Sequence, residues 1–303
     1  MFKHYLAIAR IDHWFKNVFM LPGVVIPLLY QPVVFDLMLG FKLVIGVLAT
    51  CFIASANYVI NEWLDAEFDK YHPVKKNRPS VVEGLQKKYV FLEYAIFIAL
   101  GLICAAFIGV EFLLVGFFFL VMGLMYNVRP FRTKDRPYLD VISESVNNPI
   151  RLTLGWLIIS PETFPQSSLL ISYWFGGAFL MATKRFSEYR FIGDAKLAGL
   201  YRKSFRYYDE RKLMVSLCFY ALVASFFLAI FLFKHRIELI ISFPFFALLF
   251  AWYLDMGYMK NSPAQNPETL YKQKYFLAYL VLLVAMTIAL LFINIPMLHL
   301  LME

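Results

Sequence analysis

Three side chains that can bind a divalent cation follow a long apolar run near the amino end of the chain. The run covers residues 41–60, and Asn61, Asp65 and Asp69 come directly after it at intervals of four residues. On a helix of 3.6 residues per turn they share one face, successive members being about 6 Å apart. Two carboxylates one turn apart repel each other, and a cation between them removes the repulsion. Because Mg²⁺ prefers one or two carboxylates together with water and substrate phosphates, the spacing predicts a magnesium site.

Basic side chains come next in the sequence. The stretch HPVKKNRP contains Lys75, Lys76 and Arg78, which can donate hydrogen bonds to phosphate oxygens. We therefore predict a helix that binds metal, followed by a loop that binds phosphate; a solvated helix cap and loop is the alternative. Glu62 and Glu67 lie off the face of the three ligands, and we expect them to be surface acids.

A second polar cluster occupies residues 126–151. Asp140, Glu144, Asn148 and Arg151 recur at i, i+4, i+8 and i+11, which is one face of a continuous helix. Polar groups inside a membrane span are costly unless they face a wet cavity or one another. The cluster therefore predicts a cavity wall, with a packing network between helices as the alternative. The bases at its entrance, which would attract an anion or acidic lipids, are Arg129, Arg132, Lys134 and Arg136.

A third charged cluster lies at residues 182–194, ATKRFSEYRFIGD. Lys184 and Glu188 are one helical turn apart, and Arg185 adjoins them. Such a pair is most often a surface pair of little energetic value. Its position at a third charged helix end makes it a candidate part of the same site.

The elements that carry these clusters are predicted to be membrane helices. The chain has 303 residues, of which 61% are hydrophobic and 17% charged, and it contains 32 Phe. A bilayer core takes about 20 apolar residues of helix, and the chain offers about nine runs of this kind. Their length and uniform apolarity favour an all-α membrane bundle over strands of alternating polarity. The runs lie near residues 18–32, 37–60, 90–108, 111–128, 139–160, 166–186, 213–233, 237–256 and 275–299.

The distribution of bases predicts the orientation of this bundle. If the nine runs alternate across the membrane, only Lys42, Lys234 and Arg236 fall on one side. Arg151 lies within a run, and all the other Lys and Arg residues fall on the opposite side. The positive-inside rule makes that opposite side cytoplasmic, together with the amino terminus and the active-site cavity. The formal charge of +8 therefore indicates membrane topology and phosphate binding, and we expect no nucleic-acid partner. We predict one membrane domain over residues 1–303, with residues 1–17 as an interfacial segment.

The motif N-x3-D-x3-D at the end of the second predicted helix resembles the UbiA-type superfamily of intramembrane prenyltransferases. Further stretches are similar to its polyprenyl-phosphate (decaprenyl-phosphate) phosphoribosyltransferase branch: RIDHWFKN, KYHPVKKNRP, LDV, KRFSEY and RKSFRYY. The family usually has Asp where this chain has Glu62. Many members also carry a second D-x3-D where this chain has Glu188 alone. The resemblance makes Glu188 a further candidate metal ligand and implies that Lys184 and Arg185 bind phosphate directly.

The resemblance also implies a reaction in which a diphosphate leaves an electrophilic carbon. Asp65 and Asp69 would hold Mg²⁺ against the diphosphate and Asn61 would orient it, while Glu144 and Arg151 would orient the acceptor. No covalent nucleophile is needed. The implied substrate-binding residues are Lys16, Lys76, Arg78, Tyr126, Arg132, Lys134, Asp140, Glu144, Arg151, Lys184 and Arg185.

Two choices of substrate remain open at this point. The chain would transfer phosphoribose from phosphoribosyl diphosphate to a polyprenyl phosphate, or a prenyl group from its diphosphate to an aromatic or lipid acceptor. Either reaction needs an isoprenoid lipid and a phosphorylated co-substrate, and the resemblance is to enzymes of the prokaryotic inner membrane. The alternatives from other classes are a transporter, because Glu144, Arg151 and Asp255 could line a pathway, and a purely structural membrane protein.

Overall fold

Helices form the regular structure of this protein in the computed structural model, which describes residues 2–82, 84–265 and 267–299. No strand occurs among these residues. The helices divide between two compact units: unit 1 comprises residues 1–165 and 192–208, and unit 2 comprises residues 166–191 and 209–303.

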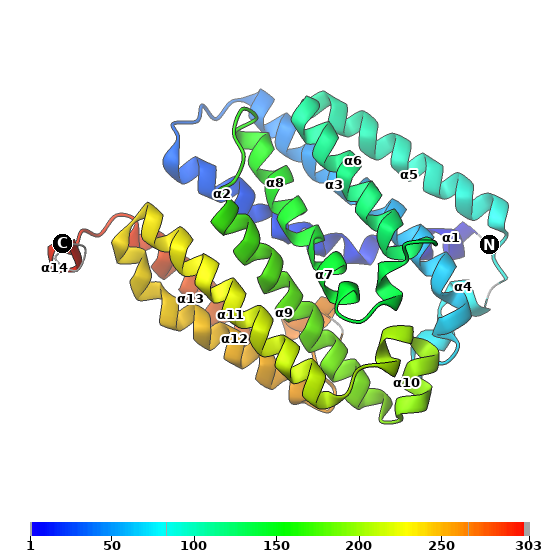
Figure 1. Ribbon diagram of the computed structural model, residues 1–303. Coiled ribbons are helices and arrows are strands. Elements are labelled where there is room, and N and C mark those ends of the chain that lie inside the picture. The colour runs from blue at the N-terminus through cyan, green and yellow to red at the C-terminus, as the bar shows by residue number, and fades with distance from the viewer. Residues whose placement is uncertain (1, 83, 266, 300–303) are drawn as a thin grey trace. The chain divides into compact units, whose positions relative to one another are not determined.

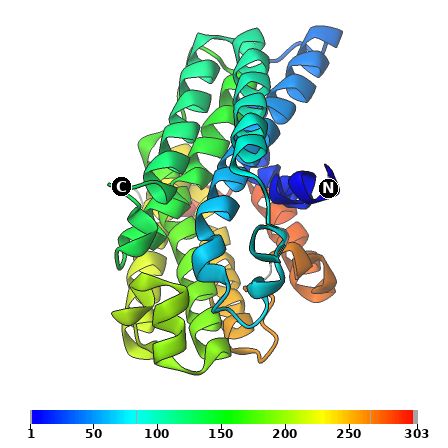
Figure 2. The ribbon, with the colours of Figure 1, turned by 90° about the vertical axis from the view of Figure 1, so that its right-hand side faces the viewer.

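Unit 1 is built around the long helix α3, Leu37–Asp69. Its amino end is capped by Asp36, whose Oδ1 accepts from the backbone N–H of Leu39 at 2.7 Å, because the first turn of a helix leaves donors without partners. Helices α5 (Lys87–Ile108) and α6 (Val110–Asn127) pack along α3 and meet at Gly109 (Figures 1 and 2). The other helices of this first part are α1 (Phe2–Ile8), η1 (Ile11–Met20), α2 (Leu21–Tyr30), η2 (Lys75–Asn77) and α4 (Pro79–Val82).

Helix α2 packs closely against α8, Asn147–Ile159. A Cβ atom on Gly23 would lie 1.9 Å from the carbonyl oxygen of Leu152, and one on Gly155 would lie 2.3 Å from that of Met20. Only glycine permits this approach of two backbones. Behind this contact, α3, α5, α6 and α8 enclose an apolar core, which fixes the position of the polar end of α3.

The predicted helix over residues 139–160 is divided in two. Helix α7 covers Leu139–Ser145 and α8 begins at Asn147. Pro149 explains the break, because it lacks an N–H for the carbonyl of Ser145 and its ring clashes with that carbonyl. The prediction of one continuous helical face carrying all four polar residues is therefore wrong. The remaining helices of unit 1 are η3 (Thr133–Asp135), α10 (Ala195–Tyr201) and η4 (Lys203–Arg206).

Unit 2 is a group of long apolar helices held by aromatic contacts. The ring of Phe179 meets that of Phe250 edge to face at 4.8 Å, and Ser172 Oγ donates to the carbonyl of Ala224 at 3.0 Å. Its helices are α9 (Ser167–Ile192), α11 (Glu210–His235), η5 (Ile237–Ser242), α12 (Phe243–Tyr258), η6 (Pro267–Lys272), α13 (Lys274–Leu290) and α14 (Pro296–His299).

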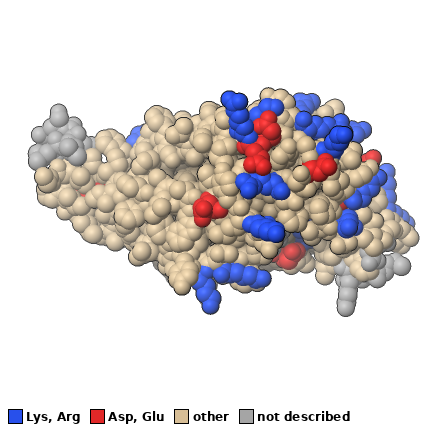
Figure 3. Space-filling view, turned by 90° about the horizontal axis from the view of Figure 1, so that it is seen from below, with Lys and Arg blue, Asp and Glu red and all other residues tan. Residues whose placement is uncertain are grey.

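The composition and length of the helices confirm an integral membrane protein. Five stretches of the described chain are long and apolar enough to cross a bilayer: Leu37–Asp69, Lys87–Ile108, Val110–Asn127, Glu210–His235 and Ile237–Tyr258. Lys274–Leu290 is a shorter apolar helix. Charged side chains lie close together over part of the face drawn in Figure 3, and broad uncharged areas surround them.

Candidate active site

The three predicted metal ligands lie on the last turns of α3, as the spacing requires. The side-chain amide of Asn61 donates to Asp65 Oδ2 at 3.3 Å and to Asn127 Oδ1 at 2.6 Å. Asp69, one turn further on, is only 2% exposed. The stripe is therefore a built feature of the fold and is not a solvated helix cap.

Two bases from the connection between α6 and α7 reach Asp65. Lys134 Nζ lies 2.5 Å from Asp65 Oδ1, and Arg132 Nη2 lies 3.1 Å from the same oxygen. Arg132 has a left-handed backbone with φ of 31°, so a strained turn aims its side chain. Both bases are buried, and Lys134 also donates to Asn127 Oδ1 at 2.7 Å. Asn127 thus connects the stripe of Asn61, Asp65 and Asp69 to the bases.

Asp69 has a base of its own from the loop after η2. Arg78 Nη1 lies 2.5 Å from Asp69 Oδ2 and 3.5 Å from Glu62 Oε2. Glu62 is 3% exposed and also lies 4.0 Å from Arg10 Nη1. The expectation that Glu62 is a surface acid is wrong, because two arginines from other segments cover it; Glu67 is exposed as expected.

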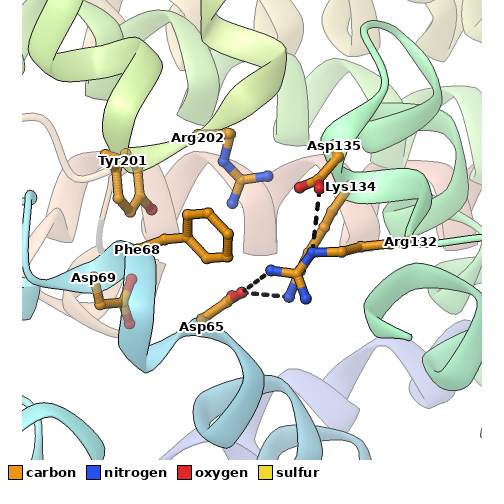
Figure 4. Close-up of a pocket in the computed structure, with 8 residues that line it drawn as sticks. All are labelled: Asp65, Phe68, Asp69, Arg132, Lys134, Asp135, Tyr201 and Arg202. Atoms are coloured by element: carbon orange, nitrogen blue, oxygen red, sulfur yellow. Dashed lines mark hydrogen bonds and ion pairs between the residues drawn. The ribbon is translucent and has the colours of Figure 1, made fainter. Parts of the chain in front are cut away.

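A pocket lies where these segments meet. It opens between the end of α3, the loop after α6 and the end of α10, as Figure 4 shows. Asp135 forms ion pairs with bases of two segments: its Oδ2 lies 3.3 Å from Arg132 Nε and 3.3 Å from Lys203 Nζ. The residues that line the pocket are Asp65, Phe68, Asp69, Arg132, Lys134, Asp135, Tyr201 and Arg202.

Burial and neighbouring charge set the ionisation of the loop bases. Burial lowers the pKa of Lys134 to about 8, against the attraction of Asp65 and with the help of Arg132. Burial would also lower the pKa of Arg78, but the carboxylates of Asp69 and Glu62 outweigh it and raise that pKa above its usual range. Arg78 is therefore a permanent cation, whereas Lys134 can lose its proton slightly above neutral pH.

The polar residues of α7 and α8 form separate contacts on the two sides of the break. The carboxylate of Asp140 is completely buried and accepts from Ser204 Oγ and Tyr208 Oη. Glu144 Oε2 accepts from Tyr126 Oη at 2.7 Å. In α8, Arg151 is 5% exposed and its Nε donates to Asn17 Oδ1 at 2.9 Å.

The remaining predicted residues lie outside the lining of the pocket. Lys16 is half-buried with its ammonium 5.6 Å from the centre of the Tyr58 ring, and Lys76 is exposed. Lys184, Arg185 and Glu188 belong to unit 2, where Arg185 Nη1 lies 3.7 Å from Glu188 Oε2 and both are buried. Their participation in the site of unit 1 stays a prediction.

Several residues of the pocket region were not among the sequence candidates. Tyr201 is the last residue of α10 and Arg202 begins the base-rich stretch RKSFRYY, but nothing in the sequence indicates that these residues reach α3. Asn127 carries a weak signal, because it is an amide at the end of an apolar run. Its two contacts show that such an amide connects helix ends.

Comparison with known proteins identifies the family. Residues 19–278 match the model of the UbiA prenyltransferase family. The chain belongs to this family. A solved structure shows that the family fold extends over nearly the whole of this UbiA protein. The structure is that of a UbiA homologue from Archaeoglobus fulgidus bound to GPP and Mg²⁺, and it superposes with a TM-score of 0.71 at 21% identity. The match covers 96% of this chain and 100% of that one.

Curated relatives match over shorter stretches of this UbiA family member. A decaprenyl-phosphate phosphoribosyltransferase from Corynebacterium glutamicum is 29% identical over 59% of this chain and 52% of its own length. The protein y4nM from Sinorhizobium fredii is 30% identical over 52% of this chain and 29% of its own length. The chain thus spans about half, or less, of the length of these relatives.

The donor atoms of the α3 stripe fit Mg²⁺. The described residues hold no group of three or more His, Cys, Asp and Glu side chains arranged for a metal, so an all-protein cage of such ligands is not formed there. Mg²⁺ instead accepts one or two carboxylates and completes its shell with water and substrate phosphates. Asp65 and Asp69 supply two carboxylates at the rim of one pocket, and Asn61 supplies an amide beside them.

Proposed function

We propose that this UbiA family transferase uses Mg²⁺ and moves phosphoribose from phosphoribosyl diphosphate to a polyprenyl phosphate. The observation that carries the proposal is the set of four bases around the α3 carboxylates. Arg78, Arg132, Lys134 and Arg202 come from three separate segments and surround Asp65 and Asp69. Such a set suits two phosphorylated substrates better than one. The names of the Corynebacterium glutamicum and Mycolicibacterium smegmatis relatives support the same choice.

In this reaction a phosphate oxygen of the lipid attacks the anomeric carbon of the sugar. The new bond joins that oxygen to the anomeric carbon, the bond from this carbon to the diphosphate breaks, and pyrophosphate leaves with the electron pair. Mg²⁺ bound by Asp65 and Asp69 would neutralise charge on the leaving diphosphate. No side chain has to form a covalent bond to the substrate.

The bases of the pocket provide fixed positive charge where the leaving group develops negative charge. Arg132 and Lys134 are held in place by Asp65 and by the amide of Asn127. Because they are positioned before the substrate binds, they need little reorganisation during the reaction. Glu144 and Arg151 would orient the acceptor from the α7 and α8 side. Contacts of Lys16, Lys184, Arg185 and Glu188 with phosphate or metal stay predictions from the sequence and are not part of this proposal.

Prenyl transfer is the second candidate. The solved Archaeoglobus fulgidus homologue binds GPP in one structure and DMAPP in another, each with Mg²⁺. The same carboxylates and bases could bind a prenyl diphosphate, with an aromatic or lipid acceptor in place of the lipid phosphate. Family membership supports either transfer over the transporter alternative.

The two candidates are separated by substrate pairs. Purified protein with Mg²⁺ is incubated with radiolabelled phosphoribosyl diphosphate and polyprenyl phosphate, and in parallel with geranylgeranyl diphosphate and a quinone precursor. We expect a labelled lipid and released pyrophosphate from the first pair only. Product from the second pair alone would overturn the phosphoribosyl assignment and retain the transferase. Asp65→Asn serves as the inactive control.

We further propose that the site faces the cytoplasm of a prokaryotic cell from the inner membrane. The support is the placement of the bases: Lys42, Lys234 and Arg236 are alone on the opposite side of the predicted topology. Single cysteines at Lys76 and at Lys42, in a chain with the natural cysteines replaced, should react with a membrane-impermeant maleimide from opposite sides of the membrane. Labelling of Lys76→Cys from outside intact cells would reverse the orientation.

A further inference from the structure

The segment of residues 192–208 packs within unit 1, although the helices before and after it belong to unit 2. It contains α10 and η4 and has no long apolar run to bury. Together with the buried ring of Phe205, its polar contacts determine where it lies. The strongest of them converge on one acid at the start of α7.

That acid is Asp140, which is completely buried. Its Oδ1 accepts from Tyr208 Oη at 2.7 Å and its Oδ2 from Ser204 Oγ at 2.9 Å. Ser204 is also completely buried, and Tyr208 is 4% exposed. A carboxylate in such surroundings is costly unless its oxygens accept hydrogen bonds with good geometry. The two hydroxyls meet this requirement only when residues 204–208 lie against α7.

The backbone next to Asp140 is consistent with a fixed junction. Tyr138 has φ of 64°, which is unfavourable for a residue with an aromatic side chain. Its N–H donates to Tyr208 Oη at 2.5 Å, and the two rings meet edge to face at 5.5 Å. Tyr208 therefore holds both the turn before α7 and the carboxylate at its start.

The same segment supplies one wall of the pocket. Tyr201 and Arg202 line it, three and two residues before Ser204, which forms the junction. Arg202 Nη1 lies 3.4 Å from Tyr126 Oη and 3.9 Å from Asp140 Oδ2. Lys75 Nζ donates to Tyr201 Oη. The guanidinium thus lines the pocket, with its Nη1 directed toward the hydroxyl of Tyr126 and the buried carboxylate of Asp140.

We propose that Asp140 is a positioning residue: through Ser204 and Tyr208 it holds residues 199–208 so that Arg202 presents a cation to an anionic substrate in the pocket. This assignment replaces direct contact of Asp140 with substrate. It rests on the proposed function in taking the ligand of the pocket to be a diphosphate. The proposal adds Arg202 to the site as a residue that binds the phosphate groups of this ligand.

The test combines hydrogen exchange with kinetics in the full chain in detergent or nanodiscs. Asp140→Ala should increase exchange of peptides within residues 199–208 and leave those of α5 unchanged. It should weaken binding of Mg²⁺–pyrophosphate, and raise the KM for the diphosphate substrate, about tenfold or more, as expected for loss of hydrogen bonds to a charged group, with little change in kcat. Asp140→Asn should restore most of the protection, because an amide can still pair with both hydroxyls.

Two further variants keep the test decisive if Asp140→Ala does not fold. Ser204→Ala combined with Tyr208→Phe removes both donors and leaves the acid, and it should reproduce the loss of protection and the higher KM. Glu162→Ala, an exposed acid in the same unit, is the control without effect. Unchanged exchange in residues 199–208 would overturn the positioning role, and so would weaker pyrophosphate binding with protection retained.

The exchange measurement also separates this proposal from the proposed function. If neither substrate pair reacts and wild-type protein does not bind Mg²⁺–pyrophosphate, the proposed function fails. The anchoring of residues 199–208 by Asp140 is then still decided by exchange. Arg202→Ala should weaken pyrophosphate binding without exposing the segment, and equal binding by this variant would remove Arg202 from the site.

Discussion

The two units of this protein use charged side chains in different ways. In unit 1 an acid is paired with bases far away in the sequence: Asp65 contacts Arg132, which is 67 residues downstream. In unit 2 the ion pair of Arg185 and Glu188 joins neighbouring turns of one helix. Local pairs of this kind stabilise a helix end, whereas pairs between distant segments fix the shape of a pocket. The function of a charged helix end therefore depends on whether side chains from distant segments contact it.

Removal of the metal should have the largest effect on the enzyme. Chelation with EDTA should reduce transfer to the background, because Asp65 and Asp69 then hold no cation against the diphosphate. Excess Mg²⁺ should restore the activity. Binding of Mn²⁺, measured by electron paramagnetic resonance, compares the charged helix ends of the two units. We expect Mn²⁺ binding to be lost in Asp65→Asn and kept in Glu188→Gln. Loss in both variants would mean that unit 2 provides a metal ligand.

Asp65→Asn should lower kcat by about a thousandfold, the order expected for removing a preorganised electrostatic contact. The amide keeps the size of the side chain but loses its charge toward the metal, Lys134 and Arg132. Turnover is measured by release of pyrophosphate, and the folded state by elution as a single species in size-exclusion chromatography. Substantial activity in the folded variant would contradict the metal assignment.

Gly23→Ala should destabilise the protein by about 1–3 kcal/mol or more, as forced overpacking does. The added methyl group would meet the backbone of Leu152, which cannot move aside as a side chain can. The matched change in unit 2, Gly176→Ala, places the methyl group 4.0 Å from its nearest neighbour, the ring of Phe250. Thermal unfolding followed by tryptophan fluorescence should show a lower Tm for the first variant only. Equal Tm values would show that α2 and α8 have room to separate.

Glu188→Gln should have the smallest effect, a decrease in kcat/KM of less than about tenfold, or under about 1.4 kcal/mol of transition-state stabilisation. Its carboxylate lies 3.7 Å from Arg185 Nη1 of the same helix, and the amide keeps the size of the side chain while losing this ion pair. Steady-state kinetics with both substrates varied gives the value. A decrease as large as that of Asp65→Asn would remove the contrast between the two helix ends.

The fold and the helical face shared by Asn61, Asp65 and Asp69 were largely predictable from sequence, and the shape of the pocket was not. Long apolar runs specify membrane helices, and the four-residue spacing of Asn61, Asp65 and Asp69 depends only on helix geometry. The break between α7 and α8 was missed, although Pro149 was a sufficient signal. Glu62 was misread because its burial depends on Arg10 and Arg78.

The wall formed by Tyr201 and Arg202 could not be predicted in this way. Its position depends on two hydroxyls that meet Asp140 across 64 and 68 residues of sequence. No local periodicity reports such a pairing, because hydroxyl side chains are common in loops. The position of this pocket wall therefore depends on long-range polar contacts, which cannot be predicted from a single sequence.

The separation of Asp65 from its bases has a consequence for synthesis of the chain. Arg78 follows Asp69 by nine residues, so this pair can form almost as soon as α3 leaves the ribosome. Asp65 has to await Arg132, 67 residues later, which is roughly 3–13 s at about 5–20 residues per second. During that interval the carboxylate of Asp65 lies at the end of a membrane helix without Arg132 and Lys134, the two bases that contact it in the folded protein. The nascent α3 must therefore keep Asp65 in contact with water until the α6 helix has been inserted and the loop after it has folded back.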